Sequence, residues 1–442
     1  MHDDAFGLTP DTTIRDSLYD LMPLPREASA ILATPAFLRL DGIQQLGFVS
    51  RVWPGARHTR FEHSLGVMHL MREALLRLTT RDANARRLID DETARTAIAA
   101  ALLHDIGHYP FSHAIEDLGP PVATHEEVGR GIVLGDDAGI AALLREQWRV
   151  DPQRVARMIF PAGEPLPEQD ALVRGLLSGV LDVDKLDYLP RDARACRVPY
   201  GGVDTARLLD ALRVLEVDGR PRIGISDKGI PALHSLINAR QEMFDNVYWH
   251  HTNRACMAML LRAVQDAILA GLPASDLTRH TDSGLLLRLA APELPASTRL
   301  LIAGLAERRI HKRAVEISSR AGQLYAWLGA LFTSPARRRD LEQTMVAALR
   351  RVSGLAVEEG EILIDIPKPE RWRTDAWVGF DQPPLGMQPL MAWADVAGTD
   401  DALLRAYEER RRLIRIVCSA HLREVVRARW DTLLLPLLAG GV

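Results

Sequence analysis

Residues 92–121 read ETARTAIAAALLHDIGHYPFSHAIEDLGPP and carry the clearest structural signal in this chain of 442 residues. Ala and Leu dominate the first half of the segment, which predicts a helix buried on all sides. We expect this helix to end near Gly107 and Pro110, because proline is unfavourable inside a helix. The adjacent polar residues His104 and Asp105 stand near its end. A buried helix end with this pair predicts a site as well as a core.

Helical periodicity extends outward from this segment. The predicted helices cover residues 63–78, 170–195 and 230–272, which are rich in Ala, Leu and Arg. Strand signals are sparse: residues 213–226 predict a hairpin with an Asp-Gly turn, and residues 361–369 alternate like a strand. We therefore expect a mainly α protein, with a helical core over residues 1–270 and a smaller α+β region over residues 271–442.

Composition excludes several classes of protein. The chain is 47% hydrophobic and 25% charged, and its net charge of -4 argues against a general basic surface for nucleic acids. Cys196, Cys256 and Cys418 are far apart and form no CxxC pair, so neither a disulfide framework nor a zinc–thiolate site is expected. The N-terminal residues do not resemble a signal peptide, and no apolar run approaches the roughly 20 residues of a membrane span. These features predict a cytoplasmic protein without a membrane partner.

Histidine and aspartate gather in four segments of the predicted helical core. They are ARHTRFEHSLG (56–66), LLHDIGHYPFSH (102–113), THEE (124–127) and LDVDKLDYLPRD (181–192). Unpaired polar groups in a core cost free energy, and a divalent cation would remove that cost. Imidazole and carboxylate together suit Mn, Fe, Ni or Zn. The alternative is a set of hydrogen-bonded core residues without a metal.

These segments, with ATPAFLRLDGIQQLG (33–47) and WPGARHTRFEHSLGV (53–67), resemble a known family. In this order they are similar to the deoxynucleoside triphosphate (dNTP) triphosphohydrolases of the HD superfamily, which includes bacterial dGTPase-like enzymes and the vertebrate enzyme with SAM and HD domains. The resemblance runs from about Ile14 through QEMFDNVYWHHTNRA (241–255) and weakly into RRLIRIVCSAHLREVV (411–426). It implies an HD-domain helical core and a metal-dependent nucleotide phosphohydrolase.

The resemblance also implies a role for each matching residue. The implied ligands of a divalent metal (Mn, Fe, Ni, Zn or Mg) are His63, His104, Asp105 and Asp184. The implied catalytic residues are His108, His125, His113 and Glu116, the last at a position where some relatives carry Asp. The implied substrate contacts are Gln45, Leu46, Arg60, Lys185, Tyr188, Asp192, Arg240 and Tyr248. Of these, Arg60, Lys185, Arg240 and Tyr248 would hold the polyphosphate, and Gln45 and Asp192 could bond a sugar 3′-hydroxyl.

Many of these residues could instead have a purely structural role. The further histidines could orient or cap, the cationic residues could be surface charges, and the tyrosines could be core aromatics. His58, His69 and His234 are expected to be structural or surface residues. Pro190 should kink its helix and leaves the direction of Asp192 open.

The expected reaction converts a dNTP and water into a deoxynucleoside and triphosphate. Alternatives are an HD phosphohydrolase of another nucleotide (a monophosphate, an alarmone or a cyclic nucleotide) or of a nucleic-acid end, and a non-catalytic nucleotide sensor. The resemblance also implies a homo-oligomer. Ala33 and Asp41 stand where the vertebrate relative uses Asp and Arg to bind its guanine nucleotide activator, so we expect activity without GTP, or an activator bound elsewhere.

Overall fold

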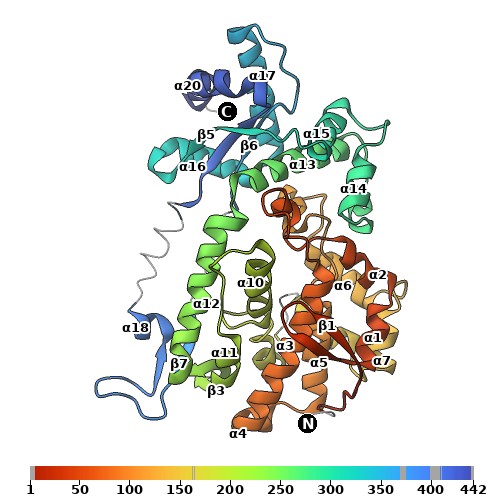
Figure 1. Ribbon diagram of the computed structural model, residues 1–442, viewed down its shortest axis with the longest axis vertical. Coiled ribbons are helices and arrows are strands. Elements are labelled where there is room, and N and C mark those ends of the chain that lie inside the picture. Colours follow the sequence, from red (N-terminus) through yellow and green to blue (C-terminus); the bar gives the residue numbers. More distant parts are fainter. Residues whose placement is uncertain are drawn as a thin grey trace.

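The computed structural model describes residues 5–439 apart from 162, 164, 369–374, 399–408 and 410, and leaves out the side chains of 113 and 436–439. A helical core forms one part of the molecule and a smaller α+β region the other, with α12 (Ile230–Met243) and α13 (His251–Leu269) running from one to the other (Figure 1). The predicted mainly α class, with a smaller C-terminal α+β region, is confirmed.

Three helices of the core carry the candidate site at their ends. They are α3 (Arg60–Arg81), α5 (Asp91–Leu103) and α10 (Val183–Cys196). Each begins at a side chain that accepts a hydrogen bond from the backbone of its first turn: Thr59, Asp90 and Asp182, respectively. Such caps satisfy N–H groups that have no partner inside the helix. The caps therefore fix where each helix begins.

The other helices surround these three or build the second region. In the core they are α1 (Arg26–Leu32), α2 (Pro35–Leu38), α4 (Ala83–Leu88), α6 (His125–Leu134), α7 (Ile140–Glu146), α8 (Pro152–Ile159), α9 (Glu168–Arg174) and α11 (Thr205–Ala211). After α13 follow α14 (Asp282–Leu289), α15 (Ala296–Ala306), α16 (Gln323–Ala330), α17 (Pro335–Ser353), α18 (Trp393–Ala397) and α20 (Arg423–Ala439). No helix in the described ranges is long and apolar enough to cross a membrane.

The predicted hairpin is present. Strands β3 (Leu212–Val217) and β4 (Arg220–Ser226) pair antiparallel in continuous register. Asp218 and Gly219 between them have φ values of 51° and 72°, as a two-residue turn between twisted strands requires.

A late segment of the chain returns to this hairpin. Strand β7 (Trp377–Gly379) pairs in parallel with β4, and β8 (Leu390–Ala392) pairs with β7, giving the order β3-β4-β7-β8. Figure 1 shows this blue segment beside α12 and β3. The sequence did not predict these two strands, and the proposed division of the chain at residue 270 stays a prediction.

The α+β region has its own sheet and its own apolar cluster. Strands β5 (Lys312–Ile317), β9 (Ile414–Cys418) and β6 (Ile362–Asp365) pair antiparallel in the order β5-β9-β6. The strand expected near residues 361–369 is confirmed as β6.

A further hairpin near the start of the chain was not predicted. Strands β1 (Pro10–Asp16) and β2 (Asp20–Pro25) pair antiparallel. Asp16 closes the turn by accepting hydrogen bonds from the N–H groups of Leu18 and Tyr19.

Candidate active site

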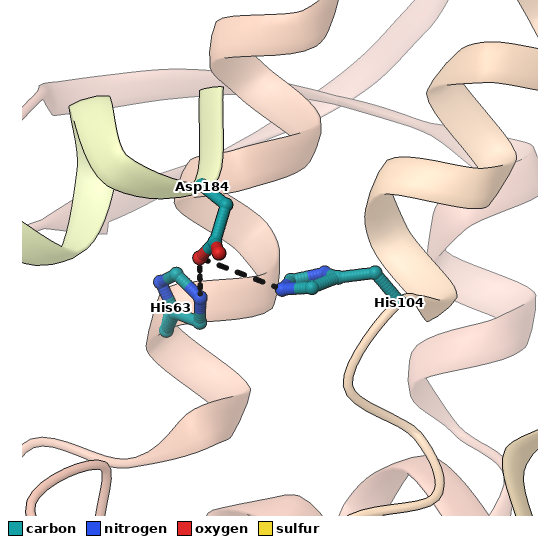
Figure 2. Close-up of side chains that lie close together, drawn as sticks. All are labelled: His63, His104 and Asp184. Carbon is teal, nitrogen blue, oxygen red and sulfur yellow. Dashed lines mark ion pairs between the residues drawn. The ribbon is translucent and has the colours of Figure 1, made fainter. Parts of the chain in front are cut away.

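Three side chains from three helix ends meet beside α3. His63 lies in the first turn of α3, His104 is the residue that ends α5, and Asp184 lies in the first turn of α10. Asp184 Oδ1 lies 3.0 Å from His63 Nε2 and 3.9 Å from His104 Nε2 (Figure 2). The side chain of Asp184 is 33% exposed, so solvent reaches the group from one side.

The hydrogen bonds of the two imidazoles show what this group can hold. His63 Nδ1 donates to Asp187 Oδ2 at 2.7 Å, and His104 Nδ1 donates to the Ala101 carbonyl at 2.8 Å. In a neutral ring this leaves each Nε2 as an acceptor. Neither Nε2 atom has a hydrogen-bond partner among the described residues, although both face the Asp184 carboxylate. Three acceptors turned toward one point fit a divalent cation, and metal-binding imidazoles are commonly oriented in this way.

Asp105 lies at the edge of the same group. Its Oδ1 is 3.4 Å from His104 Nε2, and its Oδ2 is 3.7 Å from His63 Nε2. Its Oδ2 also accepts a hydrogen bond from Arg60 at 2.5 Å. Burial alone would raise the pKa of Asp105, but Arg60 and the imidazoles hold that pKa well below its usual range. We call His63, His104, Asp105 and Asp184 the ligand cluster.

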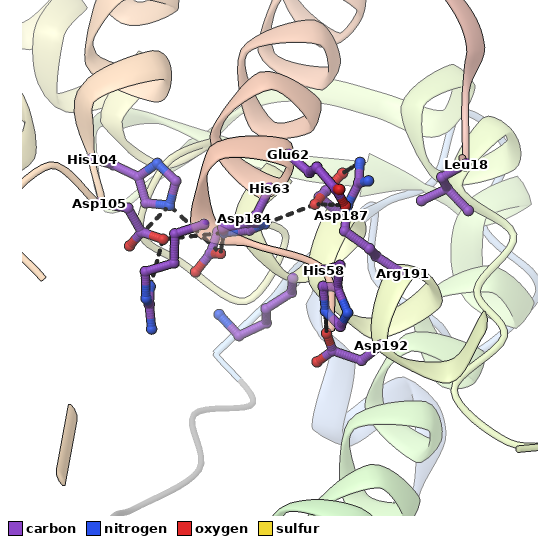
Figure 3. Close-up of polar contacts among 12 residues, drawn as sticks. Leu18, His58, Glu62, His63, His104, Asp105, Asp184, Asp187, Arg191 and Asp192 are labelled. Atoms are coloured by element: carbon purple, nitrogen blue, oxygen red, sulfur yellow. Dashed lines mark hydrogen bonds and ion pairs between the residues drawn. The ribbon is translucent and has the colours of Figure 1, made fainter. Parts of the chain in front are cut away.

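Asp187 supports the ligand cluster and was missed in the sequence. It is fully buried and accepts hydrogen bonds from His63 Nδ1 and from Arg191 Nε and Nη2 (Figure 3). Burial opposes its ionisation, but Arg191 and His63 lower the pKa of Asp187 to about 2. Burial opposes the charged form of His63 as well, yet without a cation Asp184 and Asp187 raise its pKa to about 10. A metal ion that binds here would therefore replace the proton on Nε2. The third aspartate of LDVDKLD, four residues before Arg191, was the available signal.

A second group lies on the other side of Asp105. His108 and His125 stack with ring centroids 4.3 Å apart and planes at 8°, and His125 Nδ1 donates to Glu116 Oε2 at 2.8 Å. His108 Nε2 lies 3.0 Å from Asp105 Oδ1, which links the two groups. We call His108, Glu116 and His125 the relay cluster. The expected fourth member, His113, has a side chain outside the described residues.

Gly107 lets the two clusters approach each other. A Cβ atom at this position would lie 2.1 Å from the carbonyl oxygen of His125 and 2.4 Å from the nitrogen of Gly129. Both atoms belong to the backbone of α6, which cannot move aside as a flexible side chain can. The loop after His104 therefore packs directly on the first turn of α6, where His125 lies.

The residues expected around the sugar form a separate network. Tyr248 donates to Asp192 Oδ2 at 2.6 Å, and the Tyr188 ring lies 6.4 Å from the Tyr248 ring. His58, expected to be structural or at the surface, is buried, and its Nε2 lies 2.7 Å from Asp192 Oδ1. Helix α10 continues through Pro190, so Asp192 stays on the same helix as Asp184.

The helix predicted over residues 230–272 is not a continuous α-helix at Tyr248. Residues Phe244–Tyr248 form a π-helix after α12. Such turns occur often at functional sites, because the extra residue in the turn redirects the side chains that follow.

The three cationic residues expected to hold the polyphosphate already contact other residues of the chain. Arg60 bonds Asp105, Lys185 donates to the Gly179 carbonyl at 2.7 Å and pairs with Asp182, and Arg240 lies 5.5 Å from the Phe244 ring.

Gln45 and Leu46 occupy the loop before α3. The side-chain oxygen of Gln45 is buried and has no partner among the described residues, and Leu46 packs against the core. Leu46 is thus placed by packing, while Gln45 keeps a free hydrogen-bonding group.

The chain is similar in sequence to several curated proteins. An uncharacterized protein of Methanocaldococcus jannaschii is 34% identical over 251 residues, which are 57% of this chain and 49% of that protein. The uncharacterized protein YwfO of Bacillus subtilis is 35% identical over 237 residues, 54% of this chain and 51% of YwfO. The deoxynucleoside triphosphate triphosphohydrolase SAMHD1 of Homo sapiens is 28% identical over 275 residues, 57% of this chain and 44% of SAMHD1. The chain spans about half the length of these curated relatives.

A solved structure and two family models complete the comparison. A hypothetical protein from Aquifex aeolicus has the same fold, with a TM-score of 0.70 and 23% identity, over 95% of this chain and 99% of that one. The HD domain model matches residues 60–173, and the model of the HD associated region matches residues 203–378. The first range contains three residues of the ligand cluster and all of the relay cluster. The chain therefore carries an HD domain followed by an HD-associated region.

Proposed function

We propose that the chain is a metal-dependent dNTP triphosphohydrolase, which converts a dNTP and water into a deoxynucleoside and triphosphate. The proposal rests mainly on one observation: His63 Nε2 and His104 Nε2 face the Asp184 carboxylate without hydrogen-bond partners among the described residues. The proposal is supported by the match to the HD domain and by the similarity to the triphosphohydrolase SAMHD1.

The ligand cluster would hold the metal through two imidazole nitrogens and two carboxylates. When bound there, a divalent cation would lower the pKa of a coordinated water and offset negative charge on a phosphoryl group. Asp187 keeps the His63 ring in the orientation that presents Nε2, because it accepts the proton on Nδ1.

The relay cluster would handle the protons. Glu116 accepts the hydrogen bond from His125 Nδ1 and so fixes the orientation of the ring. The attacking water gives up one proton, and the 5′-oxygen of the leaving deoxynucleoside takes one up. We assign to His125 both the uptake of the water's proton and the delivery of a proton to the 5′-oxygen. His108 ties this ring to Asp105 through its stacking and its contact with Oδ1.

Phosphate groups would be held by Arg60, Lys185 and Arg240. Arginine and lysine suit this role because they combine positive charge with several donors. Arg60 and Lys185 pair with Asp105 and Asp182 without substrate, so substrate binding would exchange part of these bonds for bonds to phosphate.

The test is product analysis. The purified chain is incubated with each dNTP and each ribonucleotide in the presence of Mn²⁺ or Mg²⁺, and the products are separated by ion-exchange chromatography. Deoxynucleoside and intact triphosphate are the expected products, and Asp105→Ala should yield none. Stepwise release of single phosphates, or full activity of Asp105→Ala, would contradict the proposal.

Other results would point to the alternatives. Hydrolysis of a monophosphate, an alarmone, a cyclic nucleotide or a nucleic-acid end would retain the HD hydrolase and replace its substrate. Nucleotide binding without any turnover would make the chain a sensor.

A further inference from the structure

Asp192 is held by two donors in a buried position. Its side chain is 1% exposed, and its two oxygens face His58 Nε2 at 2.7 Å and the Tyr248 hydroxyl at 2.6 Å. Because both oxygens act as acceptors, both neighbours must donate. A buried carboxylate without such donors would be costly. The remaining lone pairs of Asp192 can accept only from a group that carries a proton, such as a sugar hydroxyl.

His58 also contacts the second residue expected at the sugar. Its carbonyl oxygen accepts a hydrogen bond from the Gln45 N–H at 3.0 Å. The neighbouring residues Gln44 and Thr59 form a β-bridge, and Thr59 is the cap that starts α3. One residue thus joins the Gln45 loop, the Asp192 carboxylate and the helix that carries His63.

We propose that His58 is a positioning residue that holds Asp192 opposite Gln45, so that both can bond one hydroxyl of the substrate sugar. This inference rests on the proposed function, because it assumes a nucleotide at the ligand cluster. The Gln45 side-chain oxygen, buried without a partner among the described residues, is the second half of this hydroxyl site. Asp192 accepts from the hydroxyl, and the Gln45 amide, which offers a donor and an acceptor, completes its hydrogen bonds.

His58 and Tyr248 act differently in this arrangement. Tyr248 lies on the π-helix after α12, whereas His58 lies in the loop that also carries Gln45. Loss of the tyrosine hydroxyl would remove one donor to Asp192 and leave the Gln45 loop in place. Loss of the His58 imidazole would separate Asp192 from that loop.

The experiment compares a dNTP with its 2′,3′-dideoxy analogue in wild type, His58→Ala and His58→Gln. The wild type should prefer the dNTP in kcat/KM by roughly 10–100-fold, the value of a hydrogen bond to a charged group. His58→Ala should reduce this preference by about tenfold. His58→Gln keeps a donor at this position and should restore part of it. A loss of stability alone would lower both rates equally.

His234→Ala is the matched control, because His234 is an exposed histidine on α12 that bonds only Asn238 among the described residues. It should retain the wild-type preference. An unchanged preference in His58→Ala would overturn the inference, whatever happens to the rate.

Calorimetric dissociation constants for the same two nucleotides separate the two proposals. Absence of hydrolysis, together with a 3′-hydroxyl contribution to binding that His58→Ala reduces, would overturn the reaction and retain the role of His58. Intact hydrolysis with equal 3′-hydroxyl contributions in wild type and variant would overturn the role of His58 and retain the reaction.

Discussion

The ligand cluster and the relay cluster contain the same kinds of side chain and differ in how those side chains are bonded. In the ligand cluster, both imidazoles use Nδ1 for an internal hydrogen bond and turn Nε2 toward a carboxylate without a hydrogen bond. In the relay cluster, His125 donates directly to Glu116, and its ring stacks on that of His108.

On the proposed function, this difference separates a cation site from a proton site, although His108, Glu116 and His125 also lie close enough together to hold a metal ion. Acceptors that face one another repel unless a proton or a metal ion lies between them, and on the proposed function a metal ion takes that place in the ligand cluster. His63 and His125 both donate from Nδ1 to a carboxylate, which fixes the tautomer of each ring. The clusters differ in their other contacts: His63 Nε2 and His104 Nε2 face the Asp184 carboxylate, whereas the His125 ring stacks on His108. Asp105 contacts both clusters and couples them.

The largest effect is expected from removing an imidazole of the ligand cluster. His104→Ala should abolish turnover and bound metal, because two imidazoles are needed to complete the ligand set. Metal content by mass spectrometry, turnover and circular dichroism check this. His234→Ala should behave as wild type, and a His104→Ala protein that retains its metal would remove the distinction between the clusters.

Removing the relay imidazole should leave the metal in place. His125→Ala should lower kcat by roughly 10²–10⁴-fold, the usual contribution of general acid–base catalysis. Glu116→Gln should have a smaller effect, because the amide oxygen can still accept from His125 Nδ1. The same metal analysis is decisive here: loss of metal in His125→Ala would make the relay cluster part of the cation site.

The stability of the protein should depend on pH through Asp282, which binds the backbone of two loops. Its two oxygens accept hydrogen bonds from the N–H groups of Gln44 and Phe111, and burial raises the pKa of Asp282 to about 6, against these bonds and nearby arginines. An unfolded aspartate has a pKa of about 3.9. The group therefore favours the folded state fully below pH 4, and this contribution is lost as the pH rises through 6.

The expected loss between pH 4 and pH 7 is on the order of 2–3 kcal/mol in the free energy of unfolding. Urea unfolding of wild type and Asp282→Asn across this range measures it, since asparagine keeps the shape but does not titrate. If the free energy of unfolding changes with pH in the same way in both proteins, Asp282 does not cause the pH dependence.

The smallest effect is expected from changing Asp187, which accepts the hydrogen bond from His63 Nδ1. Asp187→Asn still accepts from His63 Nδ1 but loses its charge, and metal affinity should fall by about 10–100-fold. Competition with a chelator of known affinity measures this. Unchanged affinity would mean that the orientation of His63 does not depend on the Asp187 charge.

The sequence predicts those parts of the molecule that depend on neighbouring residues. Apolar periodicity located α3 and α5, and the Asp-Gly pair located the turn between β3 and β4. The helix predicted over residues 170–195 is instead two helices, α9 and α10, and the helix predicted over residues 230–272 is interrupted by the π-helix Phe244–Tyr248. The HD pair and the DVDK segment identified residues that the structure brings together at the ends of α3, α5 and α10.

The features that the sequence did not predict depend on contacts between segments that are far apart in the sequence. Asp187 meets His63 across 124 residues, and His58 meets Asp192 across 134 residues, which no local pattern indicates. Strand β7 is three residues long and too short to give a pattern. Pro190 was expected to disturb its helix, but α10 continues to Cys196, because packing outweighs one missing N–H.

The return of β7 to β4 has a consequence for how the protein is made. A ribosome delivers the chain from its N-terminus, so β4 emerges about 150 residues before the strand that covers its edge. Until then the hairpin presents unpaired backbone groups that could join another chain. Truncated proteins that end before Trp377 should for this reason aggregate more readily than the full chain, although they contain every residue of both clusters.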